Sequence, residues 1–424
     1  MASRFLAVAC AACIGYVHSI RSTSTSTYNL KASAAMYIKS MEETALTKID
    51  KYSEVPGMDY HSISTFLMIF EREVLQRELN DYGYSRTVTA TQATVVLGDL
   101  HGQLFNLLAF LRDLHTRVNV KDLHLLPESK LFICDPKIQY VFMGDYVDRG
   151  ERSIEIVMLL FAYKALCPSG IILLQGNHEQ RRTNERYGFS KEVEYKFRLT
   201  NPHSQRSDLW IGFNFVFSKL PFVAVSKGSF MATHGGISPS FVRACSYQGG
   251  NFHQCLSQGV GTEMVWSDPH EGDGWATSPR GKTKYRFGRD LALQFLRSNG
   301  LKRLLRGHEQ MANGISTMWL DTKGEYAVQT VFSAADYVGT FCVHKRTNRP
   351  LRIPAWDPQM FNAGGHRNLG GMMVIDNSFV STRFDFHEFR LSGKEARKLA
   401  KEFTGAHCHA KPADLEFLGF RFGV

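Results

Sequence analysis

The chain has 424 residues, with 44% hydrophobic residues, 21% charged residues and a formal net charge of +10. These proportions are those of a soluble globular protein, and no apolar run approaches the roughly 20 residues of a membrane-spanning helix, which is therefore excluded. The length allows one large catalytic domain with extensions, or two ordinary domains. The basic charge suits anionic partners such as phosphorylated peptides, nucleic acid or acidic membranes.

The N-terminal segment has the features of a targeting sequence. An apolar run from Phe5 to Val17 precedes Ser19, which is placed like part of a cleavage site, as in a secretory signal peptide. The segment has no acidic residue before Glu42 and is rich in Ser and Thr, which equally suits an organellar transit peptide. A start that packs on the domain is the third alternative. Residues 1–40 are thus a candidate signal or transit segment with its linker, and the compartment stays open.

The cysteines do not indicate the compartment either. Six lie beyond the N-terminal segment and show no CxxC zinc spacing: Cys134, Cys167, Cys245, Cys255, Cys342 and Cys408. We predict that most of them are buried free thiols. The lack of an N-x-Ser/Thr sequon disfavours a secretory route.

The predicted elements begin with a helical extension over residues 41–90, where apolar residues recur at helical spacing in 61–81 and Gly83 follows. Strands and helices then alternate, which predicts an α/β layered domain over residues 91–385. The strands are 93–99, 139–145 and 170–178, and each precedes a helix, at 103–115, 152–166 and 179–197.

Four further strands are predicted at 228–236, 301–308, 325–334 and 370–376. The segment from Gly339 to Arg367 carries prolines, glycines and charges, and is predicted to be a long loop. Residues 386–424 form a tail without clear chemistry, and its His-Cys-His run at 407–409 is interpreted as incidental.

Polar residues of metal-ligand type follow five of these strands, each beside a glycine. They are Asp99 and His101, then Asp145 and Asp148, then Asn177, His178 and Glu179, then His234, and finally His308. Any one of them alone is more often a turn or core residue, but five such clusters at five strand ends are not a chance arrangement. Because ligands bind outside the carboxyl ends of strands in open α/β sheets, we expect these groups to meet on one edge.

This set of oxygen and nitrogen donors suits manganese, iron or zinc. It contains no cysteine, which argues against a structural zinc site. Two cations roughly 3.5–4 Å apart stabilise both the attacking and the leaving oxygen of an in-line displacement. Asp145 lies in the central cluster, and its two oxygens allow it to bridge such a pair.

The ordered motifs GDLHGQ, GDYVDRG, GNHE, HGG and RGHE resemble those of the PPP family of Ser/Thr protein phosphatases, within the metallophosphoesterase superfamily. WSDP at 266–269, SPRG at 278–281 and FSA-x-x-Y at 332–337 extend the resemblance, which covers roughly residues 91–385. It implies a calcineurin-like metallophosphoesterase fold, with a central β-sandwich flanked by helices, and a cytoplasmic location if the N-terminal segment is not cleaved.

The resemblance also implies the roles of individual side chains. Two divalent cations would share Asp145, one of them held by Asp99, His101 and Asp145 and the other by Asp145, Asn177, His234 and His308. Five catalytic side chains would complete the site: His178 as general acid, Asp148 as its partner, Arg149 and Arg280 on the phosphate, and Tyr337 lining the pocket.

The implied activity is hydrolysis of phosphoserine and phosphothreonine in protein substrates by direct attack of a metal-bound hydroxide, which needs no Ser or Cys nucleophile. Guanidinium groups match phosphate geometry, and an imidazole held by a carboxylate can protonate the departing alkoxide. A regulatory subunit is a candidate partner, whereas nucleic acid is not expected.

The chain departs from the family where Ala335-Asp336-Tyr337-Val338-Gly339 replaces the usual Pro-Asn-Tyr-Cys-Gly, which puts inhibitor sensitivity in question. The long segment from Gly339 to Arg367 replaces the short acidic loop usual there, which puts substrate choice in question. One alternative function is a dinucleoside polyphosphate or RNA-end phosphohydrolase of the same superfamily, which WSDP and SPRG fit less well. The other is a non-enzymatic phosphate-binding scaffold, against which every ligand position is filled.

Overall fold

In the computed structural model of the protein, the described residues are 28–47, 55, 57–90, 93–117, 133–135, 137–150, 152–197, 205–245, 251–335, 337–344, 350–354, 368–375, 380–384 and 406–407. Asp336 and most of the C-terminal tail, including Cys408 and His409, therefore lie outside them.

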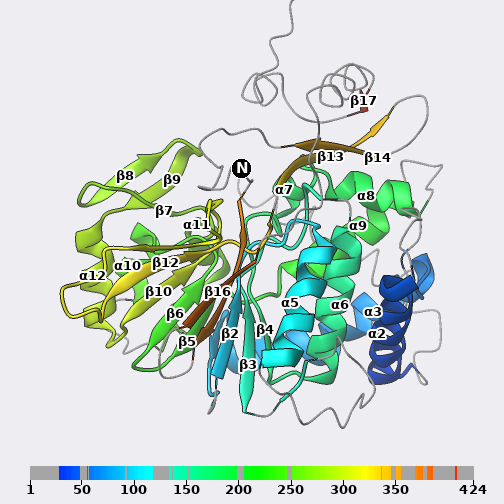
Figure 1. Ribbon diagram of the computed structural model, residues 1–424, viewed down its shortest axis with the longest axis horizontal. Coiled ribbons are helices and arrows are strands. Elements are labelled where there is room, and N and C mark those ends of the chain that lie inside the picture. The colour runs from blue at the N-terminus through cyan, green and yellow to red at the C-terminus, as the bar shows by residue number, and fades with distance from the viewer. Residues whose placement is uncertain are drawn as a thin grey trace, which may run out of the picture.

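Two large sheets form the centre of the molecule (Figure 1). The five-stranded sheet has the order β16 (Val380–Phe384), β15 (Gly370–Ile375), β2 (Ala93–Leu97), β3 (Ile138–Phe142) and β4 (Ile171–Leu173). The six-stranded sheet has the order β1 (Ser85–Thr87), β5 (Val223–Ser226), β6 (Phe230–Thr233), β10 (Arg303–Arg306), β12 (Ala327–Val331) and β11 (Ile315–Met318). Strands β2, β3 and β4 are parallel, as are β6, β10 and β12.

The alternation of side chains along the strands explains why the sheets pack as a sandwich. Val95 and Leu97 of β2 point toward a core of helices, whereas Val96 between them joins a separate core shared with the other sheet. Leu305 of β10 and Ala232 of β6 contribute to that shared core from the opposite side. Both faces of the central strands are thus buried, as their continuous apolar runs predict.

Helices cover the outer face of each sheet, so the predicted α/β sandwich is confirmed (Figure 1). One side carries α2 (Leu30–Thr47), α3 (Tyr60–Phe70), η2 (Glu71–Leu75), α4 (Gln76–Tyr82), α5 (Leu104–Arg117), α6 (Ser153–Leu166), α7 (Arg181–Asn184), α8 (Phe189–Lys196) and α9 (Gln205–Phe217). The other side carries α10 (Pro239–Cys245), α11 (Gln258–Met264) and α12 (Arg289–Ser298). None of the described helices is long and apolar enough to cross a membrane.

Two predicted elements differ from the observed ones. The helix predicted over 179–197 is two helices, α7 and α8, separated where Gly188 adopts a φ of 130°. The long loop predicted from Gly339 to Arg367 is wrong in its first part, because β13 (Val338–His344) pairs with β14 (Pro350–Pro354) in antiparallel fashion. The apolar and aromatic residues of β13 favour a strand, and the prolines of β14 stand at its ends, where a strand tolerates them.

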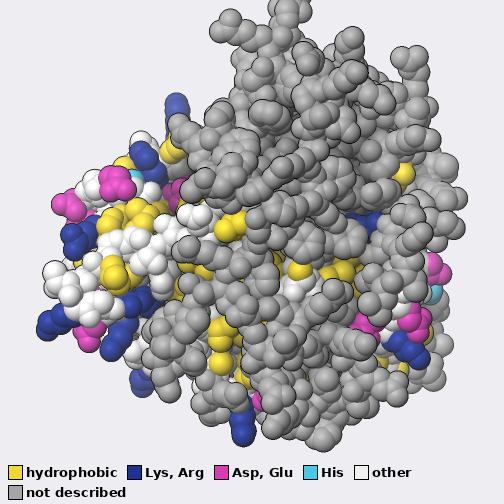
Figure 2. All heavy atoms as spheres, viewed as in Figure 1, with side chains coloured by type: hydrophobic (Ala, Val, Ile, Leu, Met, Phe, Trp, Pro, Cys, Tyr) yellow, Lys and Arg dark blue, Asp and Glu magenta, His cyan; other side chains and the backbone are white. Residues whose placement is uncertain are grey.

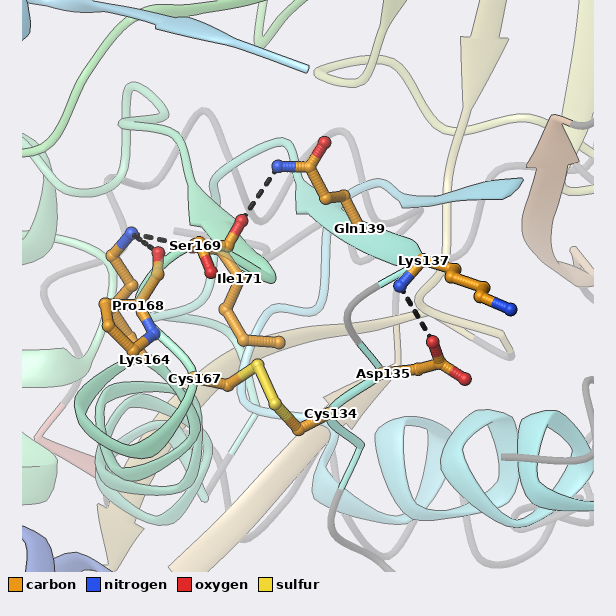
Figure 3. The surroundings of a disulfide bond; sticks show 9 residues. All are labelled: Cys134, Asp135, Lys137, Gln139, Lys164, Cys167, Pro168, Ser169 and Ile171. Carbon is orange, nitrogen blue, oxygen red and sulfur yellow. Dashed lines mark hydrogen bonds between the residues drawn. A yellow bond between two sulfur atoms is a disulfide. The ribbon is translucent and has the colours of Figure 1, made fainter. Parts of the chain in front are cut away.

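The prediction of free thiols is wrong for four cysteines, which form the disulfides Cys134–Cys167 and Cys245–Cys255. Figure 3 shows Cys134, just before β3, bonded to Cys167, just after α6. Their Cα atoms are 5.9 Å apart although 33 positions separate them in the sequence. Only the packing of α6 against the sheet brings the two sulfurs together, and that proximity has no signature in the cysteine spacing.

Removing the first disulfide is expected to destabilise the fold. The double substitution Cys134→Ser with Cys167→Ser frees a long segment in the unfolded chain, and the loop-closure entropy predicts a loss of about 2–4 kcal/mol in the free energy of unfolding. Chemical denaturation of the oxidised protein and the variant measures the difference. Equal stability of the two proteins would show that the cross-link adds nothing.

Candidate metal centre and active site

The candidate site lies where strands of both sheets end. Five loops follow the carboxyl ends of β2, β3, β4, β6 and β10. They carry seven buried side chains that the structure brings together: Asp99, His101, Asp145, Asn177, His178, His234 and His308. The groups meet as expected, but the edge belongs to two sheets rather than to one.

His101 is oriented by the backbone. Its Nδ1 lies 3.1 Å from the carbonyl oxygen of Val147, which assigns the proton to Nδ1 and leaves the Nε2 lone pair facing the site. Nε2 lies 3.6 Å from Asp99 Oδ2 and 3.5 Å from Asp145 Oδ2. Asp99 Oδ2 is buried and has no hydrogen-bond partner in the described part of the chain. A buried carboxylate oxygen without a partner is unfavourable, so a cation beside Asp99 Oδ2 would stabilise it.

His234 is held in the same way on the other side of Asp145. Its Nδ1 lies 2.9 Å from the carbonyl oxygen of Met143. Its Nε2 faces Asn177 Oδ1 at 2.9 Å, His308 Nδ1 at 3.1 Å and Asp145 Oδ1 at 3.2 Å. Several atoms with lone pairs thus converge on one point. They repel one another unless a proton or a cation lies between them.

These donors fit divalent cations. The ligand atoms of His101, Asp145 and His178 lie within 4.8 Å of one another, and so do those of Asp145, His234 and His308. Asp145 belongs to both groups because Oδ2 faces His101 and Oδ1 faces His234. A cation would also suit Asn177, because its amide oxygen faces only acceptors. Without a cation, the hydrogen bonds of this amide are satisfied only if its oxygen and nitrogen exchange places.

Without a cation, the centre holds a proton at His234. Burial acts to lower the pKa of this imidazole, but the Asp145 carboxylate beside it prevails and raises the pKa to about 9. His101 behaves differently, because burial and the neighbouring His178 lower its pKa to about 3. Burial also raises the pKa of Asp99 to about 6.

Metal binding to the apoprotein is therefore expected to release a proton and to tighten with pH. Because the raised pKa keeps His234 protonated below about pH 9, a cation must displace that proton, and the apparent affinity rises about tenfold per pH unit up to that pKa. Calorimetric titration with Mn²⁺ in two buffers of different ionisation enthalpy counts the protons released. An affinity that stays constant between about pH 6.5 and 8.5 would contradict the assignment.

The predicted acid, His178, faces the donor groups and is held by Asp148. Its Nδ1 lies 2.6 Å from Asp148 Oδ2, and its backbone N–H donates to Asp145 Oδ1 at 2.9 Å. Asp148 Oδ1 also accepts the backbone N–H of Phe189, at the start of α8, at 2.8 Å. Since the carboxylate binds Nδ1, the other ring nitrogen is directed toward the site, 3.9 Å from Asp145 Oδ2.

The three remaining predicted side chains surround the same centre. The ring of Tyr337 lies 5.1 Å from that of His101. The Arg149 guanidinium lies 4.2 Å from the ring centroid of Tyr187, which itself lies 5.3 Å from the His178 ring. Arg280 Nε lies 2.6 Å from Asp268 Oδ2, and after burial it is the main cause of the strongly lowered pKa of His308.

The loops of the centre have an unusual backbone. Five site residues other than glycine have φ between 44° and 73°: His101, Asp145, Asp148, Arg149 and His308. Such conformations persist only where the surroundings hold them. Glu179 holds one of them, because its buried carboxylate accepts the backbone N–H groups of Asp145 at 2.7 Å, Tyr146 at 2.8 Å and Gly176 at 2.9 Å.

The glycines beside the ligands are needed for close approach. A Cβ added at Gly176 would lie 2.3 Å from Asp145 Oδ1 and 2.8 Å from Glu179 Oε2. A Cβ added at Gly307 would lie 2.3 Å from Asp99 Oδ1. Both distances are far below van der Waals contact, so a side chain there would displace the carboxylate.

Gly176→Ala is therefore expected to weaken metal binding although it removes no ligand. Displacing the Asp145 carboxylate should lower metal affinity about 10- to 100-fold, as losses of supporting contacts in metal sites do. Equilibrium dialysis against Mn²⁺ measures this affinity. Gly259→Ala in α11 is the matched control, because its Cβ would meet nothing closer than 4.0 Å. Equal affinities in the two variants would show that Gly176 has no such role.

Sequence reasoning placed Glu179 in one of the polar clusters but assigned no individual role to it, nor to Asp268, Arg306 or Tyr187. Asp268 pairs with both Arg280 and the buried Arg306, at 2.6 and 2.8 Å. The signal for Glu179 and Asp268 was present, since each is an acid within one of the motifs. The role of Tyr187 depends on the break between α7 and α8, which the helical pattern did not reveal.

The chain is similar to a known protein family and to solved structures. The family model of the calcineurin-like phosphoesterases matches residues 93–311, which is more than half of the chain. A protein serine/threonine phosphatase from Saccharomyces cerevisiae, with similarity to human phosphatase PP5, is 25% identical with a TM-score of 0.55, over 78% of this chain and 92% of that one. A cold-active protein-tyrosine phosphatase of a psychrophilic Shewanella is 14% identical with a TM-score of 0.41, over 71% and 82%. With its strand-end ligands and two-sheet core, the chain belongs to the calcineurin-like phosphoesterase family.

Proposed function

We propose that the protein is a metal-dependent phosphatase that hydrolyses phosphoserine and phosphothreonine in protein substrates. The observation that carries this proposal is the carboxylate of Asp145, shared by two groups of ligands and faced by the His178–Asp148 pair. The similarity to the yeast serine/threonine phosphatase supports a protein substrate.

The donor set supports manganese, iron or zinc as the metal. We assign one cation to Asp99, His101 and Asp145, and a second to Asp145, Asn177, His234 and His308. When bound, the cations would neutralise phosphate oxygens and activate a water molecule as the nucleophile.

The side chains around the cations bind the phosphate and protonate the leaving group. Arg149 and Arg280 donate hydrogen bonds to the phosphate oxygens, where negative charge develops. His178 delivers a proton to the departing serine or threonine oxygen, while Asp148 keeps the ring in the orientation that this transfer needs. Tyr337 lines the pocket beside His101.

A direct comparison of substrates tests the proposal. The full chain, loaded with Mn²⁺, is assayed on a phosphothreonine peptide and on a dinucleoside tetraphosphate. Higher kcat/KM for the peptide is the expected result. Faster turnover of the dinucleotide would replace the proposal by a nucleotide phosphohydrolase, and turnover of neither substrate would favour a phosphate-binding scaffold.

We further propose that the protein matures in an oxidising compartment. The apolar N-terminal segment would direct the protein there as a signal or transit sequence and would then be cleaved off. Two disulfides support this, because such bonds persist outside reducing compartments. Peptide mapping of the native protein, alkylated before reduction, would find both pairs oxidised and the mature N-terminus beyond Ser19. Free thiols with an intact Met1 would favour the cytoplasm.

A further inference from the structure

A second cationic position lies beside the metal centre, on the three-stranded sheet of β7 (Asp268–Pro269), β9 (Gly281–Phe287) and β8 (Trp275–Ser278). The ammonium of Lys284, in β9, lies 4.2 Å from the ring centroid of Trp266. The Trp266 ring in turn packs edge-on against the ring of His308, with centroids 5.8 Å apart. Lys284 is thus separated from a candidate metal ligand by one aromatic ring.

The packing of the fold does not account for the positive charge of Lys284. Its side chain is half-buried, and it forms no ion pair with a carboxylate of the described residues. Burial lowers its pKa to about 8, and Glu263 only partly offsets that effect. The stem alone can cover Trp266, whereas the partly buried charge has a desolvation cost that an anion beside it would offset.

The neighbouring cation, Arg280, has a partner within the protein. It pairs with Asp268, which also pairs with Arg306. Lys284 lies in the strand that begins directly after Arg280 and, unlike Arg280, has no carboxylate partner among the described residues. Trp266 is fixed by its Nε1–H, which donates to Gln180 Oε1 at 2.9 Å, so the surface under the ammonium is rigid.

The region is accessible from outside. Trp266 and Lys284 are both partly exposed, and Lys282 two positions earlier is exposed. In Figure 2, Lys and Arg side chains are visible on the left of the molecule, where Figure 1 places β8, β9 and α12.

We propose that Lys284, supported by Trp266, binds a second anionic group of the substrate, so that the enzyme prefers phosphopeptides with an acidic or phosphorylated residue close to the phosphate that is hydrolysed. The inference rests on the proposed phosphatase function. An anion placed against the ammonium replaces the water that burial removes, and the adjacent ring adds a cation–π contact to the same charge.

The test compares three phosphothreonine peptides that differ only near the target residue, with alanine, glutamate or a second phosphothreonine there. The wild-type protein is expected to show kcat/KM about 10-fold higher for the anionic peptides than for the alanine peptide. Lys284→Met keeps the stem that covers Trp266 and should bring this ratio close to 1. Lys284→Arg should retain most of it, and Lys284→Glu should invert it.

The matched control is Lys227→Met, in the exposed turn between β5 and β6, at the opposite end of β6 from His234. It removes the same charge and is expected to keep the wild-type ratio. A preference for both anionic peptides would show that Lys284 binds either a carboxylate or a phosphate. A preference for the peptide with the second phosphate alone would show that Lys284 selects phosphate. Equal rates on all three peptides, or a ratio that survives in Lys284→Met, would overturn the inference. Failure to hydrolyse any peptide would instead refute the phosphatase function itself.

Discussion

Asp145→Asn is expected to lower kcat/KM for a phosphothreonine peptide at least about 1,000-fold, or about 4 kcal/mol of transition-state stabilisation. Asparagine keeps the size of the side chain but removes the charge that both ligand groups share. It also removes the oxygen that faces His101 or the one that faces His234. Metal analysis of the purified variant should show reduced occupancy, which separates this effect from a lost proton transfer.

Two controls define this experiment. Asp81→Asn removes a carboxylate from the exposed face of α4 and should leave the rate unchanged. Thermal unfolding of the metal-free proteins reports whether Asp145→Asn still folds. Activity within about tenfold of the wild type, in a folded variant, would reject Asp145 as the shared ligand and with it the proposed centre.

His178→Gln is expected to produce a loss that depends on the leaving group. For a phosphothreonine peptide the departing alkoxide is strongly basic and needs a proton, so kcat/KM should fall about 100- to 1,000-fold. For p-nitrophenyl phosphate the departing phenolate is stable without a proton, so the fall should stay below about tenfold. Parallel assays of the two substrates with the same protein preparation give this ratio.

The partner residue supplies an independent check on the acid. Asp148→Asn leaves the imidazole in place but replaces the carboxylate that lies 2.6 Å from Nδ1. It should reproduce the leaving-group dependence of His178→Gln more weakly. If the losses on both substrates were equal in both variants, the pair would serve in binding or in folding and not in proton transfer.

The elements that the sequence predicted best are those whose pattern is local. The buried strands β2 and β3 read as short, mostly apolar runs, and a glycine and an aspartate follow each of them within three residues. The hairpin of β13 and β14 was missed because its prolines and charges resemble those of a loop, whereas its pairing is set by tertiary contacts.

The site was predicted to a similar extent and for a similar reason. Its ligands stand next to strand ends, so the strand order within each sheet and the packing of the two sheets bring them together. Glu179 supports the loops through three backbone N–H groups, and this role depends on the path of the chain around it. Neither the disulfide partner of Cys134 nor the ring stacked under Lys284 follows from spacing, because each contact joins segments that meet only in the folded state.

The left-handed backbone of the metal-centre loops has an evolutionary consequence. Outside glycine, each such residue raises the free energy of the folded chain by roughly 1–2 kcal/mol, less for aspartate and histidine than for arginine. Selection for heat tolerance alone would favour glycine at Arg149, whereas selection for turnover would retain the guanidinium. A lineage that keeps its activity must therefore acquire thermal resistance in its helices and cross-links, away from these loops.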